Sequence, residues 1–171
     1  MDTHNKNSRG DRPLYTPEQR KRRDETPWTL VQGVLAPLQF LAFAISLVFV
    51  VNYLVNGTGL WAATVSILVK TGFLYAIMVT GAIWEKVVFG RYLFAEHFFW
   101  EDVVSMLVIA LHTAYVLAWL LEALPPAEQM WLALSAYVAY VINAAQFLIK
   151  FKAARSAPAV SAGVYVAEVA G

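Results

Sequence analysis

Four long apolar stretches, separated by short polar segments, account for most of the chain. They cover about residues 28–54, 60–84, 103–124 and 129–149. Each one reaches or exceeds the roughly 20 residues that a helix needs to cross the hydrocarbon core of a bilayer. Because that core offers no water to satisfy backbone N–H and C=O groups, spanning segments of this length are expected to be helical. The pattern therefore predicts an all-α fold, an integral membrane four-helix bundle that forms one domain.

The basic residues predict the orientation of this bundle. Every Lys and Arg except Lys70 lies before the first span, between the second and third spans, or after the fourth span. Those three segments share one side of the membrane if the chain crosses four times. The other two connections, around residues 52–59 and 122–129, contain no Lys or Arg. Since basic residues are enriched on the cytoplasmic side, we expect both termini and the central connection to be cytoplasmic.

The two ends of the chain differ from its apolar centre. Residues 1–14 are polar and are predicted to form a disordered tail. Residues 154–171 are rich in small side chains and are predicted to form a flexible tail, which leaves 15–153 as the membrane domain. Residues 16–19 read Thr-Pro-Glu-Gln, a capping box with proline at the first helical position. This start predicts a short basic helix on the membrane surface, although the same charges also fit a plain positive-inside anchor.

The connection between the second and third spans has an unusual composition for a membrane loop. It concentrates acidic, basic and aromatic side chains between two membrane-length apolar runs. An aromatic belt at the membrane interface explains part of this composition, and a flat, apolar ligand that enters from the cytoplasmic leaflet would also fit it. The residues concerned are Trp84, Glu85, Lys86, Phe89, Arg91, Tyr92, Phe94, Glu96, His97, Phe98, Phe99, Trp100, Glu101 and Asp102.

Two ionisable residues lie within the spans themselves. Lys70 is about ten residues into the second span, hence about 15 Å deep, and His112 lies at a similar depth in the third span. Ionisable groups at such depth are costly and are functional candidates by default. The two side chains could meet if their helices pack together. The alternatives are snorkelling of Lys70 to the outer surface and a helix-to-helix hydrogen bond of His112.

The third span carries a polar face that leads from the membrane boundary toward His112. Glu101 and Ser105 precede His112 at helical spacing, so they line one face of the helix. Glu101 and Asp102 also suit the positive end of the helix dipole, where acidic residues are common. Glu85 sits at the matching end of the second span, and its alternative interpretation is a plain ion pair with the lysine that follows it.

The chain lacks the residues that several kinds of chemistry require. It contains no cysteine, which excludes disulfides, thiolate metal sites, iron–sulfur clusters and cysteine nucleophiles. We find no internal repeat, no phosphate-binding glycine loop and no dinucleotide fingerprint. The sequence therefore gives no indication of a nicotinamide oxidoreductase or of nucleic-acid binding. No cofactor and no protein-bound metal are predicted.

Several separate blocks of the sequence resemble one known family. They are Tyr15-Thr16-Pro17-Glu18-Gln19-Arg20, Thr26-Pro27-Trp28-Thr29-Leu30-Val31-Gln32-Gly33, Ala36-Pro37-Leu38-Gln39-Phe40, Trp84-Glu85-Lys86, Phe89-Gly90, Phe99-Trp100-Glu101-Asp102, Leu111-His112-Thr113-Ala114-Tyr115 and Asn143-Ala144-Ala145-Gln146-Phe147. Together and in this order, they resemble the 3-vinyl (bacterio)chlorophyllide hydratases over about residues 15–153. A succession of blocks is far more specific than any single one.

This resemblance implies an enzyme of bacteriochlorophyll synthesis in a phototrophic bacterium, in its cytoplasmic or intracytoplasmic photosynthetic membrane. The implied reaction adds water across the C3-vinyl group of chlorophyllide a and gives a 3-(1-hydroxyethyl) product, which a dehydrogenase would then oxidise. A 3-vinyl bacteriochlorophyllide is the alternative substrate. The implied partners are the chlorophyllide, membrane lipid and, as candidates, other enzymes of the same synthesis.

The implied hydration needs a proton donor, because water adds after a proton reaches the terminal vinyl carbon. A carboxylic acid stays protonated near neutral pH when it is desolvated or placed beside a second carboxylate. We therefore predict Glu101 as the proton donor, with Asp102 or Glu85 keeping it protonated or orienting the water. General acid catalysis of this kind is typically worth about 10²–10⁴-fold.

The substrate also needs groups that hold it. An imidazole can ligate the magnesium of the macrocycle, and a basic side chain at the cytoplasmic boundary can pair with the propionate. The predicted magnesium ligands are His97 or His112, the predicted propionate partners are Arg91 or Lys86, and the remaining predicted substrate-binding residues are Trp100 and Lys70.

A non-enzymatic function is the main alternative. A small chlorophyll-binding or assembly subunit would use a histidine and the aromatic residues to hold its pigment, but it has no need of acidic residues along the same path. Such a protein should co-purify with stoichiometric pigment. A transporter is disfavoured, because so short a chain shows no repeat.

Overall fold

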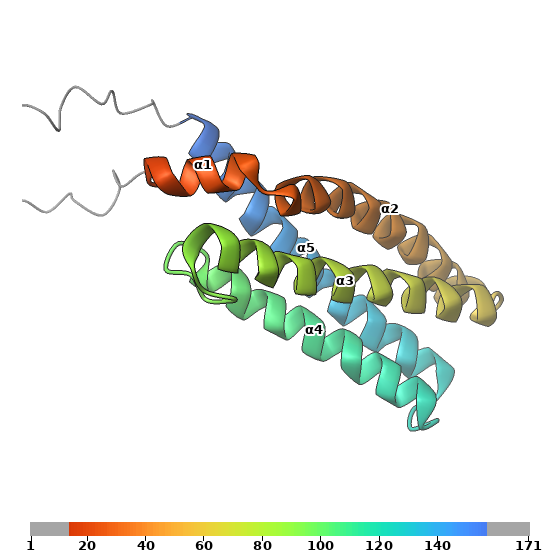
Figure 1. Cartoon of the computed structure of the whole chain (residues 1–171). Coiled ribbons are helices and arrows are strands. Elements are labelled where there is room, and N and C mark those ends of the chain that lie inside the picture. Colours follow the sequence, from red (N-terminus) through yellow and green to blue (C-terminus); the bar gives the residue numbers. More distant parts are fainter. Residues whose placement is uncertain (1–13, 157–171) are drawn as a thin grey trace, which may run out of the picture.

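Five α-helices and no strand make up the part of the chain that the structure describes. The computed structural model describes residues 14–156, so most of the two predicted tails lies outside the described residues. Four of the helices are long, and a short one precedes them (Figure 1). They are α1 (Pro17–Glu25), α2 (Pro27–Asn56), α3 (Leu60–Phe89), α4 (Phe99–Leu120) and α5 (Pro126–Ser156).

The short helix α1 begins where the capping box predicts. The Thr16 hydroxyl accepts a hydrogen bond from the Gln19 N–H at 3.2 Å, and Gln19 Oε1 accepts one from the Thr16 N–H at 2.9 Å. The helix packs against α3, and just before it Tyr15 stacks on Phe89 with ring centroids 5.8 Å apart. The predicted basic helix is confirmed, and it is anchored to the end of the bundle by aromatic packing.

The four long helices coincide with the four apolar stretches that the sequence predicts as spans. Each is long and apolar enough to cross a membrane. α4 begins at Phe99 and therefore holds Glu101 and Asp102 in its first turn. It ends at Leu120, earlier than the predicted boundary at residue 124, because Glu122 adopts a left-handed conformation (φ 49°) and a Pro-Pro pair follows.

The long helices form two hairpins that pack against each other. α2 packs mainly against α3 and α4 mainly against α5, while contacts of α2 with α5 and of α3 with α4 join the hairpins (Figure 1). In the turn of the first hairpin, Gly57 ends α2 in the left-handed conformation (φ 68°) that suits glycine. α5 continues to Ser156, a short way into the segment predicted as a flexible tail. As a result α1 and the end of α5 lie at the same end of the bundle.

Apolar packing and hydrogen bonds both join the helices in the bundle interior. The apolar core takes residues from all four long helices. Ser46 on α2 hydrogen-bonds to Ser66 on α3 at 2.8 Å and to Tyr137 on α5 at 2.5 Å. Gln32 on α2 donates to Thr80 on α3 at 2.7 Å. Interhelical packing and hydrogen bonds of this kind are what hold membrane helices together, since lipid gives little hydrophobic driving force between them.

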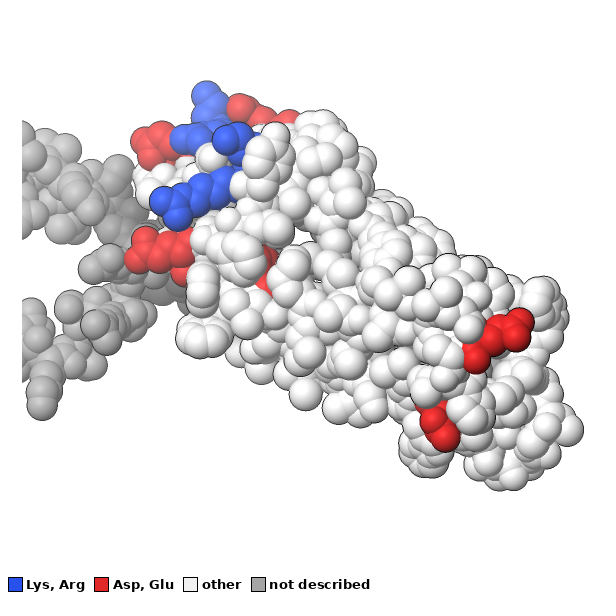
Figure 2. Space-filling model, turned by 90° about the horizontal axis from the view of Figure 1, so that it is seen from below, with Lys and Arg blue, Asp and Glu red and all other residues white. Residues whose placement is uncertain are grey.

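Basic side chains are unevenly distributed over the two ends of the bundle. Lys and Arg side chains gather at the end that holds α1, whereas only acidic side chains are coloured at the opposite end in the face shown in Figure 2. The turns at that opposite end, 57–59 and 121–125, contain no Lys or Arg. The charge asymmetry of the sequence is therefore also an asymmetry of the folded bundle.

Candidate active site

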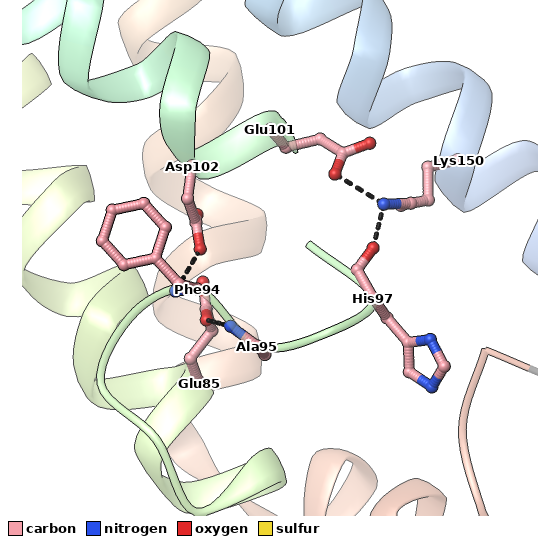
Figure 3. Close-up of polar contacts among 7 residues, drawn as sticks. All are labelled: Glu85, Phe94, Ala95, His97, Glu101, Asp102 and Lys150. Atoms are coloured by element: carbon pink, nitrogen blue, oxygen red, sulfur yellow. Dashed lines mark hydrogen bonds and ion pairs between the residues drawn. The ribbon is translucent and has the colours of Figure 1, made fainter. Parts of the chain in front are cut away.

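Three buried carboxyl groups lie at the basic end of the bundle, where α3 ends and α4 begins. Glu85 belongs to the last turns of α3, and Glu101 and Asp102 belong to the first turn of α4. The three residues are only 5, 7 and 2 % exposed, respectively. The connection at residues 90–98 runs beside them (Figure 3). Because acidic residues are rarely buried without partners, their contacts decide what each of them can do.

The connection 90–98 contacts two of these carboxyl groups through its backbone. The Phe94 N–H donates to Asp102 Oδ2 at 2.7 Å, and the Ala95 N–H donates to Glu85 Oε2 at 3.3 Å. Phe94 holds a left-handed backbone conformation (φ 58°), which is uncommon and costly for a residue other than glycine. Two successive N–H donors therefore point at neighbouring carboxyl groups, where they stabilise negative charge.

Glu85 and Asp102 form a carboxyl pair between α3 and α4. Their side chains lie within hydrogen-bonding range of each other. Two carboxylates this close repel each other strongly if both are ionised, and a hydrogen bond between them requires a proton. The carboxyl pair is thus suited to hold one proton and one negative charge in a nearly dry site.

Glu101 has a different partner from its neighbour Asp102. Glu101 Oε2 lies 2.5 Å from Lys150 Nζ on α5. The same amine donates to the backbone carbonyl of His97 and lies 4.9 Å from the centre of the Phe98 ring. Lys150 therefore supplies the counter-ion of an ionised Glu101, and it also ties the connection 90–98 to α5 (Figure 3).

Aromatic side chains enclose this end of the bundle. Phe98 lies at their centre and is 1 % exposed. The rings of Trp84, Phe89, Phe147 and Phe151 lie 5.6–6.0 Å from its ring, centroid to centroid. This cluster joins the connection to α3 and α5 and surrounds Phe98 with apolar rings. Polar contacts beside it are strengthened, because the local dielectric is low.

The structure brings Lys70 and His112 together, as their equal depth predicts. Lys70 Nζ contacts His112 Nε2, and the His112 Nδ1–H donates to the Val108 carbonyl at 2.8 Å. The amine also lies 5.1 and 4.4 Å from the ring centroids of Tyr137 and Tyr140. Lys70 is fully buried, so it does not snorkel to the surface. Both imidazole nitrogens of His112 are occupied.

The other predicted binding residues lie at or near the surface. Lys86, Arg91 and Trp100 are exposed. His97 is half-buried, and its ring contacts Phe89 at 6.4 Å between centroids and points away from the three acidic residues (Figure 3). Within residues 14–156, no three His, Asp or Glu side chains are grouped so that they could hold a metal ion. The buried cluster is therefore made of acids, one lysine and aromatic rings.

Comparison with known proteins identifies the family of this membrane bundle. The family model described as 2-vinyl bacteriochlorophyllide hydratase matches residues 15–153. The chain is 64 % identical over 156 residues to the protein of that name from Rhodobacter capsulatus, an alignment that covers 91 % of each chain. The chain belongs to this hydratase family. A relative of the same name from Cereibacter sphaeroides is 67 % identical over 144 residues, which cover 84 % of this chain and 89 % of the relative. No solved structure matches the chain.

The hydratase family match covers all of the buried site. Residues 15–153 include the carboxyl pair, Glu101 and Lys150. The family resemblance read from the sequence blocks is confirmed. Membership in a family of hydratases favours an enzyme over the non-enzymatic pigment-binding subunit.

Lys150 belongs to this buried cluster, but sequence reasoning does not single it out. In the sequence it counts only as one of the charges that orient the bundle. The available signal was spacing, because Asn143, Gln146 and Lys150 recur at helical intervals and so share one face of the fourth span. That face meets α4 at Glu101. Pairing the two polar faces would have suggested the contact.

Proposed function

We propose that the protein hydrates the vinyl group of a chlorophyllide, with the carboxyl pair Glu85–Asp102 as the proton donor. The observation that carries this proposal is the placement of the pair. Its two carboxyl groups lie within hydrogen-bonding range, are almost fully buried and stand beside an aromatic cluster at the end of a membrane bundle. Such a pair keeps a proton available near neutral pH, and protonation of an alkene requires a donor of this kind.

The name of the relatives supplies the substrate class. The vinyl group numbered 2 in that name is the C3-vinyl group in the current numbering of the macrocycle. Chlorophyllide a and a 3-vinyl bacteriochlorophyllide carry the same vinyl group, so the chemistry of the site serves either one. A flat macrocycle also suits a site rich in aromatic rings. We take chlorophyllide a as the first substrate to test and expect a 3-(1-hydroxyethyl) product.

In this proposal the proton comes from the carboxyl pair and not from Glu101, the donor that sequence reasoning favours. The amine of Lys150 lies 2.5 Å from Glu101, and an ionised carboxylate in an ion pair has no proton to give. Asp102, the next residue, is within reach of Glu85 instead. Glu101 then has a positioning role, because it holds the lysine that fastens the connection 90–98.

The carboxyl pair serves both steps of the hydration. Its proton moves to the terminal vinyl carbon, where the π electrons form the new C–H bond and leave a cation on the inner carbon. This cation is delocalised into the macrocycle, and a lone pair of water forms the C–O bond with it. The proton that the water sheds returns to the pair, so substrate and one water give the product. Meanwhile the N–H groups of Phe94 and Ala95 stabilise the ionised pair.

Residues near the surface are proposed to hold the macrocycle. Both ring nitrogens of His112 are occupied, whereas neither ring nitrogen of His97 hydrogen-bonds to another residue in 14–156. We therefore assign the substrate's magnesium to His97, whose half-buried ring would turn toward the bound macrocycle. The exposed Arg91 and Lys86 remain the proposed partners of the propionate, and Trp100 would pack against the edge of the macrocycle.

We further propose that both termini and the connection 90–98 face the cytoplasm. The basic end of the bundle in Figure 2 supports this orientation, because basic residues are enriched on the cytoplasmic side. The proposed location is the inner membrane of a phototrophic bacterium, including its intracytoplasmic extensions. The proposed partners on that side are the enzymes that supply the chlorophyllide and oxidise the hydroxyethyl product.

A turnover assay tests the proposed function. Membranes that contain the protein are incubated with chlorophyllide a in the dark without added cofactor and are followed by absorbance and mass spectrometry. We expect a blue-shifted red band and a product heavier by one water. Membranes without the protein serve as the control. Retention of pigment without conversion would contradict the hydratase and support the pigment-binding subunit.

A further inference from the structure

Contacts between α4 and α5 define a polar layer next to the carboxyl pair. Glu101 on α4 is ion-paired with α5, and one turn deeper Ser105 Oγ accepts a hydrogen bond from Asn143 Nδ2 at 2.8 Å. The two helices form a hairpin and run antiparallel. Asp102 on α4 and Gln146 on α5 therefore both fall between these two contacts. The layer places the Gln146 amide at the level of the carboxyl pair.

Two hydrogen-bond acceptors in this layer have no partner. The amide oxygens Oδ1 of Asn143 and Oε1 of Gln146 are buried and accept no hydrogen bond from any residue in 14–156. Asn143 is 8 % exposed and already donates through its nitrogen to Ser105. Hydrogen bonding between the two helices therefore satisfies the Asn143 nitrogen and neither amide oxygen. A buried carbonyl without a donor is costly, above all at membrane depth, so these oxygens call for a donor.

We propose that these two amide oxygens bind the water molecule that adds to the vinyl group. This assignment rests on the hydratase function proposed above. A water molecule carries two hydrogens and can donate one to each oxygen, and buried waters typically bond to about three polar groups. Asn143 and Gln146 are three residues apart on α5, so their side chains are neighbours on one helix face. That face contacts α4 beside the carboxyl pair.

Binding by two acceptors also orients the water for the reaction. With both hydrogens donated toward α5, a lone pair of the water points away from α5 and toward the vinyl carbon held at the carboxyl pair. This lone pair forms the C–O bond with the cationic inner carbon. Once the C–O bond has formed, the protonated oxygen turns from the amides and gives one proton to the ionised carboxyl pair, which regains the proton that it gave to the terminal carbon. The step needs no further reactant.

A deuterium partition experiment tests the water site separately from overall activity. In D₂O, the carboxyl pair transfers a deuteron to the terminal vinyl carbon. If water captures the cation, the hydrated product forms. If it does not, the carbon returns a hydrogen to the pair, and the recovered chlorophyllide carries deuterium in its vinyl group. At low conversion, the ratio of deuterated substrate to hydrated product therefore reports capture by water and not the rate of proton transfer.

Loss of the acceptors should shift this ratio. Gln146→Leu and Asn143→Leu should each slow hydration by about tenfold, the value of one well-placed hydrogen bond, and raise the deuteration-to-hydration ratio by a similar factor. Gln146→Glu keeps an acceptor oxygen and should keep the wild-type ratio. Gln129→Leu is the matched control, because it makes the same change in the same helix at the far end, where Gln129 donates to the Leu124 carbonyl at 2.9 Å.

An unchanged ratio in both leucine variants, whether or not hydration slows, would overturn the water site and leave the amides a structural role. If a leucine variant fails to accumulate in the membrane, Gln146→Met keeps the side-chain length and is interpreted in the same way. Wild-type protein that neither hydrates nor deuterates the chlorophyllide would instead contradict the proposed function itself. Wild-type protein that deuterates the chlorophyllide without hydrating it would support the carboxyl pair as the proton donor and would contradict the water site.

Discussion

Glu101 on α4 and Lys150 on α5 pair at 2.5 Å, Oε2 to Nζ, while the residue next to Glu101 reaches a different helix. Asp102 lies within hydrogen-bonding range of Glu85 on α3. Successive residues of an α-helix point in directions about 100° apart, because the helix has 3.6 residues per turn. Of these two adjacent acids, Glu101 is therefore an ion-paired carboxylate and Asp102 is a member of the carboxyl pair. Their different partners give them different roles.

Replacing Lys150 by Met should lower the free energy of unfolding by about 1–3 kcal/mol, because it leaves Glu101 and the His97 carbonyl without their donor. It should also slow turnover, since the connection 90–98 loses its tie to α5. Lys150→Arg keeps a positively charged donor and should retain most of the stability and most of the turnover rate. Thermal unfolding of the purified protein in detergent measures the effect. Lys21→Met is a control, because Lys21 pairs with Glu25 on an exposed surface at 3.9 Å, and such pairs contribute little. Equal melting temperatures for Lys150→Met and wild type would refute this positioning role.

Lys70 offers a test of a buried basic residue. Its amine contacts His112 and two tyrosine rings, and no acidic residue of 14–156 forms an ion pair with it. Lys70→Met preserves the side-chain length and removes a group that is costly to bury. We expect unchanged or higher thermal stability and near-normal chlorophyllide binding. Loss of binding in a folded Lys70→Met variant would instead support the substrate-binding role that the sequence predicts for this residue.

The two described histidines should behave differently toward the substrate. His97→Ala should weaken chlorophyllide binding and remove the absorbance change that accompanies axial ligation of its magnesium, and added imidazole should restore that change. His112→Ala should leave the ligation signal intact, because both nitrogens of His112 already bond within the protein. Titration of each purified variant with chlorophyllide measures both effects. The assignment would be reversed if only His112→Ala lost the ligation signal.

The absence of cysteine from the sequence makes the orientation directly testable. Single variants Glu96→Cys, in the connection 90–98, and Glu122→Cys, in the turn after α4, place one thiol at each end of the bundle. A membrane-impermeant thiol reagent applied to intact cells should label Glu122→Cys and should label Glu96→Cys only after the cells are opened. The opposite pattern would place the carboxyl pair on the outer side and contradict the proposed orientation.

Much of the fold follows from the sequence. Hydropathy predicts the four long helices, and the capping box at Thr16 predicts the start of α1. Equal depth in facing spans predicts the meeting of Lys70 and His112. Helical spacing predicts the buried face of α4, where Glu101, Ser105 and His112 are all nearly inaccessible. These features depend on periodicity and depth, which a sequence contains.

The partners of individual acids could not be predicted in the same way. Whether Glu101 or Asp102 faces Glu85 depends on the rotation of α4 about its axis relative to α3. Side-chain packing between the helices determines this rotation, and the apolar pattern of the sequence does not predict it. The contact with Lys150 depends likewise on the register of α5 against α4. The backbone donors of Phe94 and Ala95 arise from the conformation of the connection 90–98, including a left-handed residue, and carry no side-chain signal.

The most direct test of the central claim compares Glu85→Gln, Asp102→Asn and Glu101→Gln in the dark turnover assay. We expect the first two variants to slow hydration by about 10²–10⁴-fold while still binding chlorophyllide, because each removes the carboxyl pair as proton donor. Glu101→Gln should cost less, since it disturbs only the lysine that positions the connection, and the exposed Glu96→Gln should match wild type. Near-normal hydration by Glu85→Gln and Asp102→Asn, with activity lost in Glu101→Gln, would contradict the carboxyl pair as proton donor. Glu101 would then be the donor instead.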